Sequence, residues 1–247
     1  MRLALMADIH ANREALEACL DDAEAQRSER IVFLGDYVNY GADPDWVVRT
    51  IMDRVRAGTA VALLGNHDAA VNGKSATMDV PAESALEWTR NQLGADQRAF
   101  LAALPLTFDE GDCLFVHADA AAPAKWTYVT DARDATRSLK ATRRRVTFCG
   151  HVHRPMIYNL SDTLRPGTFR PVAGIAVPLL PQRRWLAVMG SVGQPRDGNP
   201  AACWASVDTA RAELTYHRIP YEVEEAARKI RRAGLPEMYA ERLEWGQ

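Results

Sequence analysis

The stretch VTFCGHVHRP, residues 146–155, places two histidines directly after an apolar run. Val146 to Cys149 has the apolar character of a short buried strand, and Gly150 ends it. Because side chains of an extended chain alternate between two faces, His151 and His153 point to the same side. Two imidazoles on one side can bind the same ligand. The pair therefore predicts a binding site, provided that the fold brings other ligating residues to the same place.

The first half of the chain alternates strands and helices, a rhythm that predicts parallel βαβ units and an α/β fold. The predicted strands are residues 2–7, 31–34 and 61–64. The predicted helices are residues 13–26, 45–56, 82–93 and 95–103.

The second half predicts shorter strands, several of them separated by Gly or Pro turns. They are residues 113–116, 146–149, 156–160, 184–189, 203–208 and 213–218. Residues 209–212 join the last two as a hairpin, and a terminal helix covers residues 223–233. Without a repeat, a low-complexity tract or a linker, residues 1–247 are expected to form a single domain.

Composition is that of an ordinary globular protein. The 247 residues are 47% hydrophobic and 25% charged, with a net charge of -2, which argues against a general binder of nucleic acid or membranes. The apolar start is too short for a signal peptide, and no stretch approaches the roughly 18 apolar residues of a membrane span. We therefore expect a cytoplasmic protein with no membrane partner. The four cysteines are far apart, which favours single buried thiols over disulfides or a structural zinc site.

Polar residues follow five of the predicted strands. The motifs are Asp8-Ile9-His10, Gly35-Asp36, Gly65-Asn66-His67-Asp68, His117 and Gly150-His151-Val152-His153. Ligands of open α/β sheets bind at the carboxyl ends of strands. Taken singly, Asp8 or Asp36 could cap a helix, and Asn66 or Asp68 could be a turn residue. The same accident at five strand ends is a poor explanation, so the pattern predicts one shared site.

The ligand chemistry favours metal. Carboxylates, an amide and neutral imidazoles form a mixed oxygen and nitrogen set that suits Mn, Fe, Zn or Ni. Seven candidates are too many for one tetrahedral ion, so we expect two divalent transition-metal ions that share a carboxylate. The candidates are Asp8, His10, Asp36, Asn66, His117, His151 and His153.

In this order, the motifs resemble those of the calcineurin-like metallophosphoesterases, whose members carry D-x-H, G-D, G-N-H-[DE], an isolated H and G-H-x-H. Residues 190–202, GSVGQPRDGNPAA, look like a segment of the small bacterial and archaeal branch of that family. The resemblance covers nearly the whole chain. It implies an α/β fold, a four-layer α-β-β-α sandwich of two mixed sheets flanked by helices.

The resemblance also implies roles for individual residues. One ion would be held by Asp8, His10, Asp36 and His153, and the other by Asp36, Asn66, His117 and His151. His67 would face the phosphate, protonating the leaving alkoxide or stabilising developing charge. Asp68 is the expected partner that orients this ring, with a turn or cap role as an equal alternative. We further expect Asp36→Asn to leave the metal-free protein as stable or slightly more stable, since Asp8 repels that carboxylate.

The implied activity is hydrolysis of a small phosphodiester or phosphomonoester by a metal-bound hydroxide. Nucleotides are among the substrates of this class. One alternative is a protein serine/threonine phosphatase, for which the short chain leaves little room for a peptide groove. The other is a non-catalytic metal-dependent scaffold, which would be expected to have lost ligands. The chain departs from the family at Ala11, at residues 118–120 and at Met189, none of which is a proposed ligand.

Three further features have weaker signals. Asn12 is a candidate substrate contact and equally a candidate cap for the helix that follows. Arg196 is a candidate phosphate-binding residue because of its fork geometry, with a solvated turn arginine as the alternative. We interpret KATRRR, residues 140–145, as a solvated helix end, because the run lacks aromatics and the chain is net acidic. Nucleic acid is therefore not an expected partner, and the oligomeric state is left open.

Overall fold

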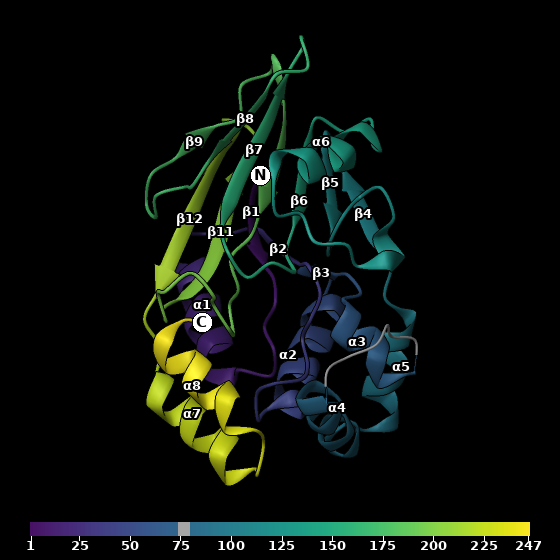
Figure 1. Ribbon diagram of the computed structural model, residues 1–247, viewed down its shortest axis with the longest axis vertical. Coiled ribbons are helices and arrows are strands. Elements are labelled where there is room, and N and C mark those ends of the chain that lie inside the picture. The colour runs from purple at the N-terminus through teal and green to yellow at the C-terminus, as the bar shows by residue number, and fades with distance from the viewer. Residues whose placement is uncertain (74–79) are drawn as a thin grey trace.

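Two mixed β-sheets lie face to face in the computed structural model, which describes residues 1–73 and 80–247, without the side chains of residues 80–82. Helices cover the outer side of each sheet (Figure 1). This arrangement confirms the predicted α-β-β-α sandwich.

The first sheet has the strand order β3-β2-β1-β11-β12-β9. Its strands are β1 Arg2–Met6, β2 Arg30–Phe33, β3 Ala60–Ala62, β9 Val177–Pro178, β11 Ala202–Asp208 and β12 Glu213–Ile219. Strands β1, β2 and β3 run parallel, as the strand and helix rhythm predicted, and β11 pairs with β1 in the antiparallel direction. The β11–β12 hairpin was also predicted.

The second sheet has the strand order β4-β5-β6-β10-β7-β8. Its strands are β4 Thr107–Glu110, β5 Cys113–Val116, β6 Val146–Cys149, β7 Met156–Ser161, β8 Pro166–Phe169 and β10 Arg183–Val188. The strand that carries the two histidines, β6, is central and pairs in parallel with both β5 and β10. The sequence did not predict β4, β8 or β9, which lie at the sheet edges.

The helices divide between the two outer layers. They are α1 Arg13–Ala25, α2 Pro44–Arg56, α3 Asn66–Val71, α4 Val80–Gln92, α5 Ala95–Ala103, α6 Ala132–Lys140, α7 Val223–Arg232 and α8 Glu237–Trp245. Helices α1 and α2 pack on the first sheet, and α6 packs on the second. The pair α7 and α8 lies beside α1 (Figure 1). Within the described part of the chain, no helix has both the length and the apolar character needed to cross a membrane.

Alternation along β1 shows how the layers are held together. Leu3 and Leu5 point into the core between the two sheets, whereas Ala4 and Met6 point into the core beneath the helices. Full burial of a leucine contributes about 1.5–3 kcal/mol, so both faces of this strand are fixed by packing. The residues that follow Met6 therefore leave the sheet from a rigid position.

Two arginines of the KATRRR run have a structural role. Lys140 ends α6, in agreement with a helix end. Arg144 Nε donates to Asp109 Oδ1 at 2.8 Å, and Arg145 Nε donates to Asp112 Oδ2 at 2.6 Å. Both ion pairs lie at the surface, with Arg144 43% and Arg145 25% exposed, so the run is solvated as interpreted and also contacts the β4–β5 hairpin.

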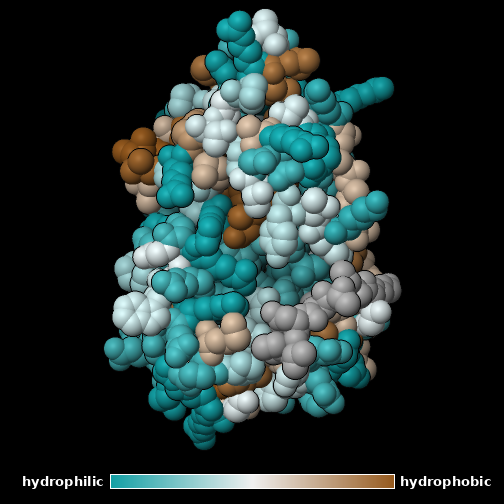
Figure 2. All heavy atoms as spheres, viewed as in Figure 1, coloured by the Kyte–Doolittle hydropathy of each residue, from teal (hydrophilic) through white to brown (hydrophobic). Residues whose placement is uncertain are grey.

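The carboxyl ends of β1, β2, β5 and β6 meet near the middle of the molecule (Figure 1). Figure 2 shows that this face is hollowed near its middle and that mainly hydrophilic residues border the hollow.

Candidate metal centre

Four side chains converge beyond the ends of β1, β2 and β6, and we call them the first half-site: Asp8, His10, Asp36 and His153. All four are at most 2% exposed. His153 Nε2 lies 3.1 Å from His10 Nε2 and 3.5 Å from Asp8 Oδ1. Asp36 Oδ2 lies 3.9 Å from His10 Nε2, so the ligand atoms surround one small volume.

A second group shares Asp36, and we call it the second half-site: Asp36, Asn66, His117 and His151. Here the atoms gather around His117 Nε2. It lies 3.3 Å from Asp36 Oδ2, 3.2 Å from His151 Nδ1 and 3.1 Å from Asn66 Oδ1. The structure therefore brings all seven predicted ligands together, with the Asp36 carboxylate between the two groups.

Backbone carbonyls fix the tautomers of the four imidazoles. The contacts are His10 Nδ1 to Val38 O at 3.0 Å, His117 Nδ1 to Leu34 O at 2.8 Å, His153 Nδ1 to Gln194 O at 2.7 Å and His151 Nε2 to Trp126 O at 2.9 Å. A carbonyl oxygen only accepts, so each contacting nitrogen carries the proton. In the neutral form of each ring, the other nitrogen then presents a lone pair to the cluster. Metal-binding histidines are commonly oriented in this way.

The ligand atoms of the first half-site include too few hydrogen-bond donors for their acceptors. With those tautomers, His10 Nε2 and His153 Nε2 face each other as two acceptors at 3.1 Å, and carboxylate oxygens lie beside them. Acceptors that converge in a buried space repel one another unless a cation lies between them. The nitrogen and oxygen donors fit divalent transition metals, and no thiolate takes part.

The backbone at the cluster is unusual. Five of the seven predicted ligands have positive φ, namely Asp8 (55°), His10 (47°), Asp36 (58°), His151 (71°) and His153 (61°). Such left-handed conformations cost of order 1–3 kcal/mol each and persist only where surrounding contacts fix them. One such contact is the backbone N–H of His151, which donates to both carboxylate oxygens of Asp8 at 3.0 and 2.9 Å.

Two glycines of the motifs allow carboxylate side chains to lie close to the backbone. A Cβ on Gly65 would lie 2.2 Å from Asp36 Oδ1, and a Cβ on Gly150 would lie 2.7 Å from Asp8 Oδ2. Any side chain at either position would displace a carboxylate of the first half-site. The glycines in G-N-H and G-H-x-H therefore serve the packing of the ligand loops.

Burial and charge set the protonation of the metal-free cluster. Burial raises the pKa of Asp8 to about 7. Despite burial, His117 and His67 hold the pKa of Asp36 well below its usual range. Despite burial, Asp36 raises the pKa of His117 to about 9. Asp36 and His117 thus form a buried ion pair, which corrects the expectation that repulsion from Asp8 dominates at Asp36.

The ring of His67 lies beside the first half-site, edge-on to His10 with 5.1 Å between ring centroids. Its Nδ1 is 2.9 Å from Asn39 Nδ2, and its Nε2 is 3.0 Å from Tyr40 Oη. Because the amide nitrogen donates, Nδ1 accepts and Nε2 carries the proton of the neutral ring. One of its ring nitrogens also lies within 4.8 Å of a ligand atom of His10 and of Asp36.

Asp68 has a different environment from the one expected. Its carboxylate accepts backbone N–H groups of Asp36 (2.8 Å), Tyr37 (2.8 Å) and Gly65 (3.0 Å). These contacts favour the alternative of a cap and loop anchor, while Asn39 and Tyr40 contact the His67 ring.

Sequence reasoning missed Asn39 and Tyr40. Both have positive φ, 71° and 68°, in the turn that follows Asp36. Burial raises the pKa of Tyr40 to about 12, so its hydroxyl keeps its proton at neutral pH. The signal that was available is the NYG sequence directly after the G-D motif, because Asn and Gly favour left-handed turns.

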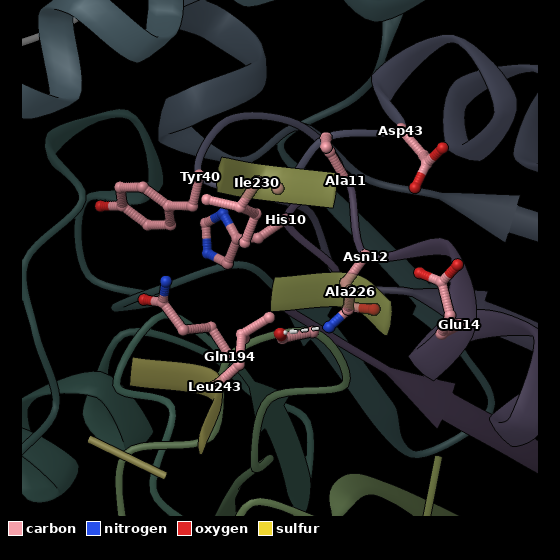
Figure 3. Close-up of a pocket in the computed structure, with 13 residues that line it drawn as sticks. His10, Ala11, Asn12, Glu14, Tyr40, Asp43, Gln194, Ala226, Ile230 and Leu243 are labelled. Carbon is pink, nitrogen blue, oxygen red and sulfur yellow. Dashed lines mark hydrogen bonds between the residues drawn. The ribbon is translucent and has the colours of Figure 1, made fainter. Parts of the chain in front are cut away.

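Asn12 acts as a helix cap. Its Oδ1 accepts the N–H of Ala15 at 3.1 Å, and its Nδ2 donates to Gly193 O and Tyr221 Oη at 2.8 and 3.2 Å. Figure 3 shows Asn12 at the wall of a cavity where the His10 ring lies beside Tyr40. That cavity is about 10 Å³, room for about one water molecule, so it cannot hold a phosphate ester.

Arg196 reaches the first half-site from the loop after β10. Its backbone N–H donates to His153 O at 3.1 Å, and its guanidinium carbon lies 5.8 Å from the centre of the Tyr40 ring. Nη2 donates to Gln194 Oε1 at 2.7 Å. The position is compatible with the predicted phosphate contact.

Two aromatic residues flank the second half-site, and neither was predicted. The Tyr128 ring stacks on His151 with centroids 4.0 Å apart and is 50% exposed. Trp126 lies edge-on to His117 at 5.8 Å. The loop that carries both residues, between β5 and α6, therefore lies beside the second half-site.

Comparisons with known proteins agree with the geometry. Residues 1–211 match the sequence profile of the calcineurin-like phosphoesterase superfamily domain. An uncharacterized protein of Methanocaldococcus jannaschii is 31% identical over 252 aligned positions, covering 99% of this chain and 98% of the relative. A metallophosphoesterase structure from Sphaerobacter thermophilus is 34% identical with a TM-score of 0.87, covering 100% of this chain and 99% of that one. A hypothetical protein from Pyrococcus horikoshii OT3 shares the fold at a TM-score of 0.81 and 17% identity, with coverage of 100% and 98%.

Proposed function

Because the chain belongs to the calcineurin-like phosphoesterase superfamily, whose members are metal-dependent hydrolases, we propose that it uses two divalent transition-metal ions to hydrolyse a small phosphodiester or phosphomonoester. One observation carries the proposal: two groups of buried acceptors share the carboxylate of Asp36. Seven ligand groups in this arrangement match two ions better than one.

The first half-site would hold one ion and the second half-site the other. Mn²⁺, Fe²⁺ or Fe³⁺, Zn²⁺ and Ni²⁺ all suit these donors. A pair of bound ions supplies Lewis-acid stabilisation of phosphoryl oxygens and lowers the pKa of coordinated water. The protein orients the imidazoles through the backbone carbonyls described above.

His67 is proposed as the group that faces the leaving oxygen. In the neutral ring its Nε2 carries the proton, and it points to Tyr40 Oη at 3.0 Å. To act as a general acid the ring must first be protonated on both nitrogens; Nε2 of this imidazolium would donate a hydrogen bond to a substrate oxygen near this pair and, as the ester bond breaks, transfer its proton to that oxygen, which leaves the neutral ring. Tyr40 Oη would then return a hydrogen bond to the ring or donate to the phosphate, because burial keeps the hydroxyl protonated.

Arg196 is proposed to contact the phosphate. No carboxylate lies within ion-pair distance of its guanidinium in the described residues, so its charge is available to an anion. The proposal for Asp68 is limited to holding the loop of Asp36 through three backbone N–H groups. Asn12 is not assigned a substrate contact, because its amide already caps α1.

Metal content and hydrolysis together test the proposal. Protein purified without chelator and resupplied with Mn²⁺ should contain close to two ions per chain by elemental analysis. The same sample should hydrolyse members of a panel of phosphodiesters, nucleotides, phosphomonoesters and phosphopeptides. A ceiling of one ion at saturating metal would overturn the shared-carboxylate arrangement. Activity confined to phosphopeptides would favour a protein phosphatase, and no hydrolysis by a fully loaded sample would refute the proposed reaction.

A further inference from the structure

A large cavity adjoins the first half-site. It has a volume of about 700 Å³, within the range of small-molecule sites. Val152 and Arg154, which flank the ligand His153, line its wall, and so does Arg196. One wall of the cavity is therefore the G-H-x-H loop itself.

The cavity is rich in arginine. Arg154, Arg170, Arg196 and Arg218 line it, together with one aspartate, Asp197. Arg218 is paired with Asp197. Across residues 1–73 and 80–247, no carboxylate lies within 4.0 Å of the other three guanidinium groups. Since the whole chain has a net charge of -2, this concentration of unpaired positive charge is local and not a consequence of a basic protein.

Arg196 joins the cavity to the metal centre. Its guanidinium lies over the Tyr40 ring, its backbone N–H binds His153 O, and its own carbonyl accepts Arg154 Nε at 2.5 Å. Arg196 therefore lines the cavity and also contacts residues of the metal centre. Guanidinium groups match phosphate oxygens in geometry and charge.

Resting on the proposed function, we infer that this cavity binds a second phosphoryl group of the substrate, apart from the one that is hydrolysed. The substrate class is then a multiply phosphorylated small molecule, such as a nucleoside polyphosphate or a nucleotide with an additional phosphate. Arg170 and Arg154 hold the distal group, and Arg196 lies between it and the scissile one.

Matched substrates test this inference. For diester hydrolysis, the pair is thymidine 5′-(p-nitrophenyl phosphate) and the same compound with a 3′-phosphate. For monoester hydrolysis, the pair is AMP and adenosine 3′,5′-bisphosphate, in which a phosphomonoester bond is broken in both members. The member with the extra phosphate should have a KM roughly tenfold lower, because a hydrogen bond between charged groups corresponds to about tenfold or more in affinity.

Arg170→Gln is the decisive variant, because Arg170 makes no ion pair with any of the residues that the structure describes. It should remove most of the KM difference within each pair while kcat stays close to that of the wild type. Arg165→Gln, an exposed arginine in the turn between β7 and β8, is the matched control and should keep the difference. An equal KM for both members in the wild type, or a difference that survives in Arg170→Gln with Arg154→Gln, would overturn the inference.

A binding measurement separates this inference from the reaction itself. In chelator, inorganic tripolyphosphate should raise the thermal unfolding temperature of the wild type and of Arg165→Gln, but not of the Arg154→Gln, Arg170→Gln double variant. If the protein showed this shift but no hydrolysis, the proposed function would be refuted and the anion site would be supported. Hydrolysis of both substrate members without the shift or the KM difference would sink the anion site alone.

Discussion

The two half-sites share Asp36 but differ in charge and exposure. The first contains a second carboxylate, Asp8, and its four ligands are almost fully buried. The second has the neutral amide of Asn66 in place of that carboxylate, and Asn66 is only partly buried. It also borders the half-exposed Tyr128. The two half-sites, each with two histidines and Asp36, thus offer different charge to an ion.

This difference indicates unequal affinity. Ligand charge and rigidity tune the affinity of a protein site for a divalent cation. An ion in the first half-site would meet two carboxylates in a buried setting, whereas an ion in the second would meet one. We therefore expect the first half-site to fill first and the second to exchange its ion more readily.

Removing the shared charge should have the largest effect, because it takes a carboxylate from both halves. Asp36→Asn keeps the size of the side chain but takes away the only carboxylate of the second half-site. At least one ion should be lost, and turnover should fall by more than roughly 10³-fold, since both ions and their stabilisation of charge depend on it. Elemental analysis and phosphoester hydrolysis measure the two effects.

The same variant has a consequence without metal. Because the buried Asp36–His117 pair is broken and His117 loses its partner, the metal-free protein should be less stable than the wild type at neutral pH. Thermal unfolding in chelator measures this, with Asp45→Asn as the control at an exposed aspartate of α2. Hydrolysis at the wild-type rate by Asp36→Asn would refute the two-ion mechanism.

His67→Ala asks whether the first half-site has a further ligand. If His67 acts on the leaving group, the variant should keep its metal and lose about 10²- to 10⁴-fold in rate, less for an activated aryl ester that needs little protonation. His217→Gln, at the one histidine outside the cluster, should leave metal content and rate near normal. Loss of an ion in His67→Ala would place His67 with His10 and Asp36 as a ligand, and equal losses on aryl and alkyl esters would indicate charge stabilisation instead.

Asn66→Asp should make the halves more alike. The added carboxylate gives the second half-site the charge that Asp8 gives the first. The Mn²⁺ dissociation constant of the second half-site, the weaker of the two, should therefore fall by roughly tenfold. Titration of the metal-free protein with Mn²⁺ should show two separated steps in the wild type and closer steps in the variant. A single indistinguishable step in both proteins would contradict the inequality proposed for the two sites.

Tyr40→Phe should have the smallest effect of the four. It removes one hydroxyl next to His67 Nε2 while keeping the ring beside His10. One hydrogen bond is worth about 1 kcal/mol, so the rate should fall by about five- to tenfold with both ions retained. Rates and metal content measured on one preparation decide this, and a loss of metal would show that Tyr40 supports the first half-site instead.

The sequence was informative where an apolar run that indicates a strand is followed directly by polar residues. Strands β1, β2, β5 and β6 were predicted from apolar runs, and the polar residues at their ends were expected to meet because ligands of open α/β sheets bind at the carboxyl ends of strands. The seven ligands were gathered by that argument together with the family resemblance. The single-domain organisation stays a prediction.

Other features depend on contacts between distant segments, which a local pattern does not contain. The edge strand β8 contains Pro166 and Gly167 and is mostly exposed, so it has neither strand propensity nor an apolar face. Asn39 and His67 are 28 residues apart and meet only once the two loops are packed. Asp68 was expected at the His67 ring, whereas three backbone N–H groups surround its carboxylate.

The first half-site is also assembled from the two ends of a long stretch of chain. His10 and His153 face each other at 3.1 Å although 143 positions separate them. At a synthesis rate of about 5–20 residues per second, His153 leaves the ribosome roughly 7–30 s after His10. During that interval, Asp8, His10 and Asp36 are an incomplete set of the proposed ligands on an unfinished chain. Under the proposed function, stable loading of an ion in the first half-site would therefore follow translation of the G-H-x-H loop.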